Sequence, residues 1–268
     1  MGRRPYKRLN FRFKIVAVFL LQNLFCFGQF TISAQGIGYV AYEYTKNLGV
    51  DYETIGILKF NSLESQFIEL SPGYITQVDT DNDDNIVATT YSKNRPLFHV
   101  DLKSDTLFTR QTLFKKVYIT KESIPIIDWK IEEKHKKIEK FECQLASGTF
   151  RGRTYKVWFT ADIPVKFGPW KLQGLPGLIL EAIDDKNAII FNAKKVVIGL
   201  KTEIDYFDTD DAMELKSYIK LKENIYNEKE KNISSKLPRD GTFKLNMPGR
   251  KTQKEIIYEW EKTKKEED

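Results

Sequence analysis

The chain has 268 residues, 41% of them hydrophobic, and a formal net charge of +6 at pH 7. This length allows one large or two small domains with a substantial core. The charge would suit a nucleic-acid binder, but residues 1–28 hold six basic and no acidic side chains, and the rest of the chain carries equal numbers of both. The sequence therefore predicts no nucleic-acid partner.

The first 28 residues have the parts of a secretory signal peptide. A basic region precedes the apolar run Ile15–Phe27, and these thirteen residues are too few for a helix to cross a bilayer, which takes about 20. Small residues follow at Gly28 and Ala34. We predict a signal peptide over residues 1–28, cut between Gly28 and Gln29 or as late as residue 34, with an uncleaved N-terminal anchor as the alternative. The mature protein is then exported, periplasmic or secreted, and has no transmembrane span.

After the signal, short patterns rich in Tyr, Val and Ile recur every 8–12 residues or so between turn residues. We therefore expect a mainly β fold with some α (α+β), built as a large curved antiparallel sheet, half-barrel or sandwich. One strand alternates clearly, with five side chains on one face and Trp158 on the other. The five are Arg151, Arg153, Tyr155, Val157 and Phe159.

An acidic stretch offers carboxylates at positions 1, 3 and 5 of a calcium-loop pattern. These are Asp79, Asp81 and Asp83. The sixth position is Asp84 instead of Gly, and the twelfth is Thr90 instead of Glu, so the sharp turn and the bidentate ligand are missing. The stretch is predicted to be the turn of a hairpin, and no metal site is expected.

The pattern becomes helical after residue 205, with Leu215, Tyr218 and Ile219 at three- and four-residue steps. We expect a helix near 209–231, capped by Thr209 or Asp210, that lays one apolar stripe on the sheet. The domain plan is a single β-rich domain over 36–237 and a charged C-terminal extension over 238–268, whose last residues are expected to be frayed.

Cysteine and histidine are scarce, and no catalytic, cofactor-binding or metal-ligating residue is predicted. Cys26 leaves with the signal, and Cys143 alternates with polar neighbours as in a half-buried strand. His99 falls on a strand and His135 among charged residues, and no Gly-x-Ser-x-Gly elbow accompanies them. The sequence favours a non-enzymatic protein without a cofactor, and a hydrolase stays as an alternative.

The stretch "GPWKLQGLPGLILEAID" (168–184) combines rigid and flexible residues with an apolar run. Pro176 presets φ for the second position of a turn, and Gly177 is expected to supply the positive φ that a type II turn needs at the third. Gly174 is expected to let Trp170 or Leu172 pack closely over the turn. Residues 178–183 should then form a strand buried on both faces.

This stretch resembles the signature of the GLPGLI family, secreted proteins of Bacteroidetes-type bacteria named after the hexapeptide. The similarity covers about residues 141–184, with "GYVAYEY" near the mature start as a looser match. It implies an exported envelope protein of unknown function, and it carries over no catalytic residues. The signature residues, read as structural, are Gly168, Pro169, Gly174, Leu175, Pro176, Gly177, Leu178 and Ile179.

Three functional hypotheses remain open. The first is non-enzymatic binding of an apolar ligand or of a partner protein of the envelope, for which a curved sheet could offer a groove. The second is a periplasmic hydrolase, and the third is a structural or interaction module of the cell envelope. A filled interior without a groove would argue against the apolar ligand.

Overall fold

The computed structural model describes residues 37–49, 51–70, 80–81, 85–86, 94–200, 203–205, 208–238, 243–245 and 247–262. The predicted signal peptide and its cleavage site at Gly28 and Gln29 lie outside these residues, as do residues 263–268. No helix among the described residues combines the length and apolar character needed to span a membrane.

The described chain is mostly strand. The strands are β1 (Ile37–Asn47), β2 (Asp51–Phe60), β3 (Glu64–Leu70), β4 (Thr80–Asp81), β5 (Asn85–Ile86), β6 (Leu97–Asp101), β7 (Thr106–Leu113), β8 (Lys116–Ser123), β9 (Trp129–Ile138), β10 (Phe141–Phe150), β11 (Arg153–Thr160), β12 (Leu178–Asp184), β13 (Ile189–Leu200) and β14 (Met213–Glu214). The helices are α1 (Leu215–Ser234), the 3₁₀ turn η1 (Arg250–Thr252) and α2 (Glu259–Lys262).

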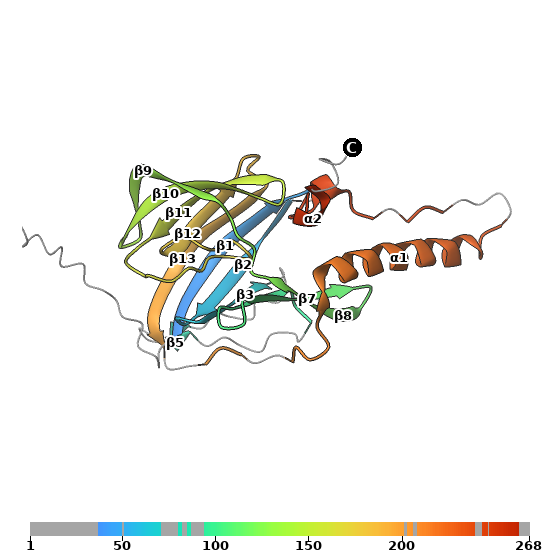
Figure 1. The fold of residues 1–268 in the computed structure, drawn as a ribbon, viewed down its shortest axis with the longest axis horizontal. Coiled ribbons are helices and arrows are strands. Elements are labelled where there is room, and N and C mark those ends of the chain that lie inside the picture. Colours follow the sequence, from blue (N-terminus) through green and yellow to red (C-terminus); the bar gives the residue numbers. More distant parts are fainter. Residues whose placement is uncertain are drawn as a thin grey trace, which may run out of the picture.

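Twelve strands form one sheet in the order β14-β8-β7-β6-β3-β2-β1-β13-β12-β11-β10-β9. All neighbours are antiparallel except β14, which pairs parallel with β8. The sheet curls into an open half-barrel, and one helix packs at its far end (Figure 1). The predicted fold class is confirmed. β4 and β5 pair separately as expected of a hairpin, while Asp79, Asp83 and the residues between the two strands lie outside the described part.

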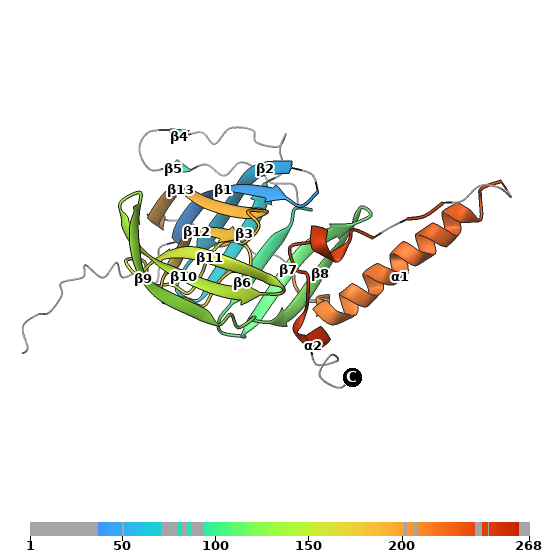
Figure 2. The ribbon, with the colours of Figure 1, turned by 90° about the horizontal axis from the view of Figure 1, so that it is seen from above.

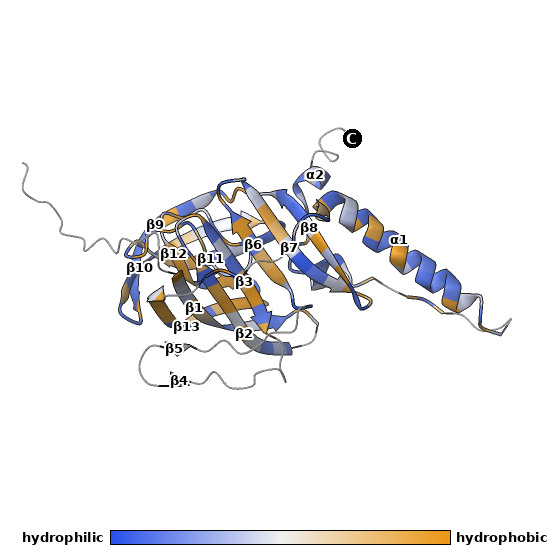
Figure 3. Cartoon of the chain, turned by 90° about the horizontal axis from the view of Figure 1, so that it is seen from below, coloured by the Kyte–Doolittle hydropathy of each residue, from blue (hydrophilic) through white to orange (hydrophobic). Residues whose placement is uncertain are grey.

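The inside of the curve is packed with the chain's own side chains. Residues 161–177, which we call the plug, connect β11 to β12 and contribute six buried apolar residues to the main core. These are Ile163, Val165, Phe167, Trp170, Leu172 and Leu175. The Trp170 ring lies 6.5 Å from the Phe98 ring on β6 and 5.5 Å from the Phe150 ring on β10. It therefore packs between two strands that are far apart in the strand order of the sheet. Hydrophobic residues are concentrated on the curved sheet, whereas α1 is mostly hydrophilic (Figure 3).

The apolar run after the plug forms β12, as predicted. Leu178, Ile179, Leu180 and Ala182 are fully buried, because neighbouring strands and the core cover both faces. The hydroxyl of Tyr42 on β1 donates a hydrogen bond to the carbonyl oxygen of Ile179 at 2.6 Å. β12 is therefore fixed in the middle of the sheet by packing and by a long-range hydrogen bond.

The predicted type II turn at Pro176-Gly177 is wrong. Gly177 does not have a positive φ, whereas Gly174 has φ +98°. Gly177 is needed for space, since a Cβ there would lie 2.1 Å from the carbonyl oxygen of Thr160. The plug thus leaves β11 and enters β12 through a backbone contact that only glycine permits.

The helix differs from its prediction in its start and its packing. It begins at Leu215 after Glu214, with no side-chain cap and no acidic residue in its first turn. The main chain reaches it from β14, and Asp210 lies earlier, where its N–H donates to the side chain of Asp208. Only Leu215 and Tyr218 are buried, so the helix covers the sheet with its first turns and the rest projects outward (Figure 1).

The expected strand position of Cys143 is confirmed, and its thiol is fully buried on β10. Burial raises the pKa of Cys143 to about 12. Because the thiolate is the reactive form, Cys143 should resist a thiol reagent at pH 8 in the folded protein and react fully in guanidinium. Absorbance of the released reporter group measures this, and complete labelling of the folded protein within minutes would contradict it.

Candidate functional site

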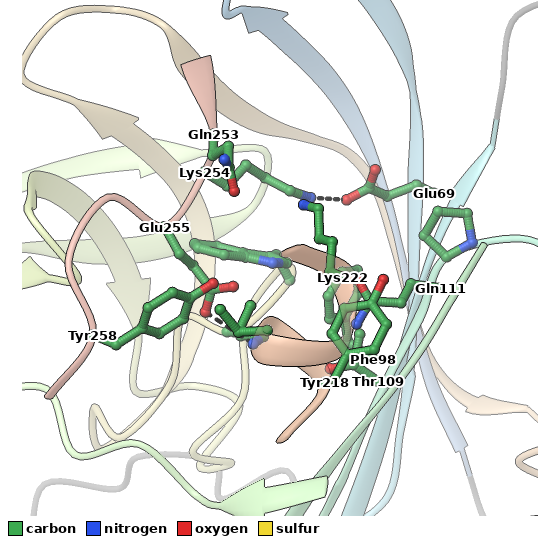
Figure 4. A pocket seen from close by; sticks show the side chains of 14 residues that line it. Glu69, Phe98, Thr109, Gln111, Tyr218, Lys222, Gln253, Lys254, Glu255 and Tyr258 are labelled. Atoms are coloured by element: carbon green, nitrogen blue, oxygen red, sulfur yellow. Dashed lines mark hydrogen bonds and ion pairs between the residues drawn. The ribbon is translucent and has the colours of Figure 1, made fainter. Parts of the chain in front are cut away.

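A pocket of about 220 Å³ opens at the mouth of the curved sheet (Figure 4). Its walls come from β3, β6 and β7, from the plug, from α1 and from the C-terminal segment. The lining residues central to its chemistry are Glu69, Phe98, Trp170, Lys171, Lys254 and Glu255. Since most of these are charged or aromatic, the mouth differs from the apolar interior behind it.

The chain beyond α1 returns to the mouth of the sheet. Beyond α1 the chain runs back along the helix, where Ser234 Oγ donates to the carbonyl oxygen of Phe243 at 3.2 Å. It then returns to the sheet near η1 and α2 (Figure 2). Residues 249–258, which we call the strap, cross the mouth. The N–H groups of Ile256 and Ile257 donate to the carbonyl oxygen of Arg151 at 2.8 and 3.1 Å.

The side chain of Arg153 holds the main chain of the strap. Its guanidinium donates to the carbonyl oxygens of Lys251 (3.2 Å), Gln253 (2.7 Å) and Lys254 (3.1 Å). It also donates to Asp184 Oδ2 at 2.7 Å, and both side chains are almost fully buried. Arg153 therefore holds the strap at three carbonyls without depending on the side chains of the strap.

A second cluster of side chains forms ion pairs with an acidic side chain of the strap. The side chains of Arg151 and Lys171 are each 2% exposed, and both contact Glu122 on β8 and Glu255 on the strap. Lys171 Nζ lies 2.7 Å from Glu122 Oε1 and 2.9 Å from Glu255 Oε1. Burial alone would raise the pKa of Glu255, but Lys171 and Arg151 outweigh it and hold the pKa below its ordinary value.

Lys254 enters a cage at the other side of the strap. Its Nζ lies 5.1 Å from the Phe98 ring centre, 5.2 Å from Trp170 and 5.5 Å from Tyr44, and it contacts the carboxylate of Glu69. Cations bind aromatic faces within about 6 Å of the centroid. Burial lowers the pKa of Lys254, and Glu69 opposes this. Three ring faces and one carboxylate thus surround one ammonium group.

Acid should release the strap. The lowered pKa of Glu255 means that its ion pairs contribute stability above about pH 4.5 and lose it as the pH falls through the lowered value. We expect the protection factors of the strap amides, which correct for the slower intrinsic exchange of amides in acid, to fall as the pH drops below about 4.5, before those of the β11 amides do. Glu255→Gln should flatten this dependence, whereas Glu142→Gln on the exposed face of β10 should preserve it. A strap equally protected at pH 3 and pH 7 would contradict this account.

The signature residues lie in the plug and in the first two positions of β12, and their structural role stays a prediction. Trp170 and Lys171 sit among them and line the mouth pocket, a role the sequence analysis missed. It also missed Arg151 and Arg153, although the alternation already placed both on the face that proves to be buried. Two arginines on a core face were the signal for a buried ionic site.

The histidines lie away from the mouth pocket. His135 is exposed on β9. His99 is half-buried on β6, with Nε2 3.7 Å from Glu64 Oε2, and burial lowers its pKa despite Glu64. Neither is among the residues that line the mouth pocket. Within the described ranges, no group of three or more His, Cys, Asp or Glu side chains is placed to hold a metal.

A family model described as "Protein of unknown function (Porph_ging)" matches residues 150–181. This segment contains the plug and four residues of the mouth: Arg151, Arg153, Trp170 and Lys171. No curated protein matches the chain in sequence. The segment that matches this family model therefore contributes residues to the mouth.

Solved structures of PNGF-II are similar to part of this chain. One, in a C2 crystal form, has a TM-score of 0.50 and 15% identity over 71% of this chain and 33% of that chain. The other, in a second crystal form, has a TM-score of 0.49 and 15% identity over 71% and 34%. The chain thus spans about a third of the length of PNGF-II. An uncharacterized conserved protein from Thermus thermophilus has a TM-score of 0.35 and 9% identity over 67% of this chain and 90% of that chain.

Proposed function

We propose that this protein is an exported, non-enzymatic binding protein of the cell envelope that holds a segment of a partner protein at the mouth of its curved sheet. The basic and apolar pattern of residues 1–28 supports export to the periplasm or the exterior. The resemblance to the GLPGLI family supports the same compartment. Binding at the mouth is supported by the geometry of the strap.

The observation that carries the proposal is the way Arg153 and Arg151 hold main chain. The Arg153 side chain donates to three strap carbonyls, and the Arg151 carbonyl accepts two strap N–H groups. Main-chain hydrogen bonds give affinity for an extended peptide, and pockets for its side chains give specificity. The mouth offers main-chain hydrogen bonds and pockets for side chains. The strap occupies it in the way that a bound peptide would.

The filled interior favours a partner protein over an apolar ligand. The plug places Ile163, Phe167 and Leu172 where such a ligand would have to lie. The hydrolase alternative gains no support from His99 or His135, which lie outside the mouth pocket. The role of an interaction module of the envelope agrees with the proposal and is included in it.

Peptide exchange tests the proposal on the complete protein. A protease site inserted between the exposed residues Leu237 and Pro238 is cut after folding, so the strap stays bound without a covalent link. A dye-labelled peptide of residues 249–262 is then added, and fluorescence anisotropy follows its binding. We expect saturable binding that unlabelled peptide reverses, and none for a scrambled peptide. Failure of the labelled peptide to enter at any concentration, or equal binding of the scrambled one, would overturn the proposal.

A further inference from the structure

The mouth recognises two adjacent side chains of opposite charge. Lys254 points into the cage of Tyr44, Phe98 and Trp170 beside Glu69, and Glu255 points to Lys171. The strap is bent here, since Lys254 and Glu255 follow the 3₁₀ turn η1. The two side chains reach different walls of the mouth, and Figure 4 shows Lys254 directed toward Glu69.

The two walls differ in chemistry, and this fixes the order of the charges. The cage wall carries one carboxylate, Glu69, whose side chain is 12% exposed. The other wall carries Arg151 and Lys171 against Glu122, and Arg151 also pairs with Glu259 just beyond the strap. With the main chain held by Arg153, reversing the two residues would place a carboxylate beside Glu69 and an ammonium beside two cations.

The arrangement of charges favours exchange over simple opening. Without Glu255, Lys171 would keep Glu122 alone while Arg151 would keep Glu122 and Glu259, and without Lys254 the carboxylate of Glu69 would lose its partner. Removing one member of a buried ion pair is strongly destabilising, because it leaves the other charge buried and uncompensated. The strap is thus displaced most readily by another segment that supplies the same two charges in the same order.

Two features allow such an exchange. The strap is carried beyond α1, which is buried against the sheet only at Leu215 and Tyr218. In addition, the hydroxyls of Tyr44 and Tyr155 have no hydrogen-bond partner among the described residues, although both are buried near the charges of the mouth. A buried hydroxyl without a partner is unfavourable. The structure with the strap in place therefore leaves these two hydroxyls unpaired.

We propose that the mouth selects a segment in which a lysine is followed directly by a glutamate, and that the strap is the built-in occupant that such a segment of a partner protein replaces. This inference rests on the proposed function and specifies its ligand. The cage accounts for the lysine, the Arg151–Lys171 pair for the glutamate, and Arg153 for the main chain.

The cleaved protein described above tests the selection with a panel of peptides of residues 249–262. One carries norleucine in place of Lys254, which keeps the length and removes the charge. A second carries Gln in place of Glu255, and a third has the two residues exchanged. We expect at least tenfold weaker binding for each of the first two and more than thirtyfold for the third. A peptide with Ala in place of the exposed Lys251 should bind within a factor of two to three of the parent.

The protein variant Phe98→Leu adds a check that does not depend on its stability. The ratio of lysine to norleucine peptide affinity, measured within that one protein, should fall toward one. Equal binding of the lysine and norleucine peptides to the unchanged protein would overturn the selection while leaving the proposed function standing. If no peptide of the panel enters the mouth, the proposed function itself fails.

Discussion

Arg153→Met is expected to destabilise the protein by about 3–5 kcal/mol and to free the strap from the sheet. The side chain of Asp184 is fully buried and would lose the cation that pairs with it at 2.7 Å. The strap would lose three hydrogen bonds to its carbonyls in the same substitution. One residue thus supports both the interior of the sheet and the main chain of the strap.

Chemical denaturation and limited proteolysis measure the two effects separately. Lys156→Met is the matched control, because Lys156 lies on the same strand with its side chain on the exposed face. It should change the free energy of unfolding by less than about 0.5 kcal/mol and leave the strap uncut. If Arg153→Met behaved like this control, the ionic account of the mouth would be wrong.

Gly177→Ala is expected to have the second large effect, a decrease of about 3–5 kcal/mol in the free energy of unfolding. The new Cβ would lie 2.1 Å from the carbonyl oxygen of Thr160, and a backbone atom cannot rotate away as a side chain can. The plug would have to shift, and Trp170 with it. Loss of the native near-ultraviolet signal and a lower denaturation midpoint would report this.

The control for this substitution is Gly249→Ala. Gly249 has φ −56°, and no atom lies within 4 Å of the position that its Cβ would take. It should leave the midpoint nearly unchanged. Equal effects at Gly177 and Gly249 would show that the close approach to Thr160 does not constrain the plug.

The sheet and its buried strand were predictable from local patterns. The alternation of β11 placed Arg153, Tyr155 and Val157 on one face, and the structure buries all three. The apolar run of β12 indicated burial on both faces, which is confirmed. In both cases the strand period of two residues carries the information within a few neighbours.

The mouth was not predictable, because its partners are far apart in the sequence. Lys254 contacts a carboxylate 185 residues earlier, at Glu69, and Arg151 pairs with Glu255 across 104 residues. In the sequence, Lys254 and Glu255 are not distinguished from the many other charged residues near the C-terminus. The same limit explains the error at Gly177, where a local turn rule competed with a backbone contact made only in the folded chain. The domain boundaries at residues 36, 237 and 238 stay a prediction, although the strap contacts the sheet.

Hydrogen exchange of the unmodified protein at neutral pH tests the central claim, that the mouth holds a polypeptide segment through its main chain. The amides of Ile256 and Ile257 donate to the Arg151 carbonyl. We predict that they exchange far more slowly than in a free peptide of residues 249–262, with protection close to that of β11. Exchange at the rate of the free peptide would show that the strap does not occupy the mouth, and would contradict the account.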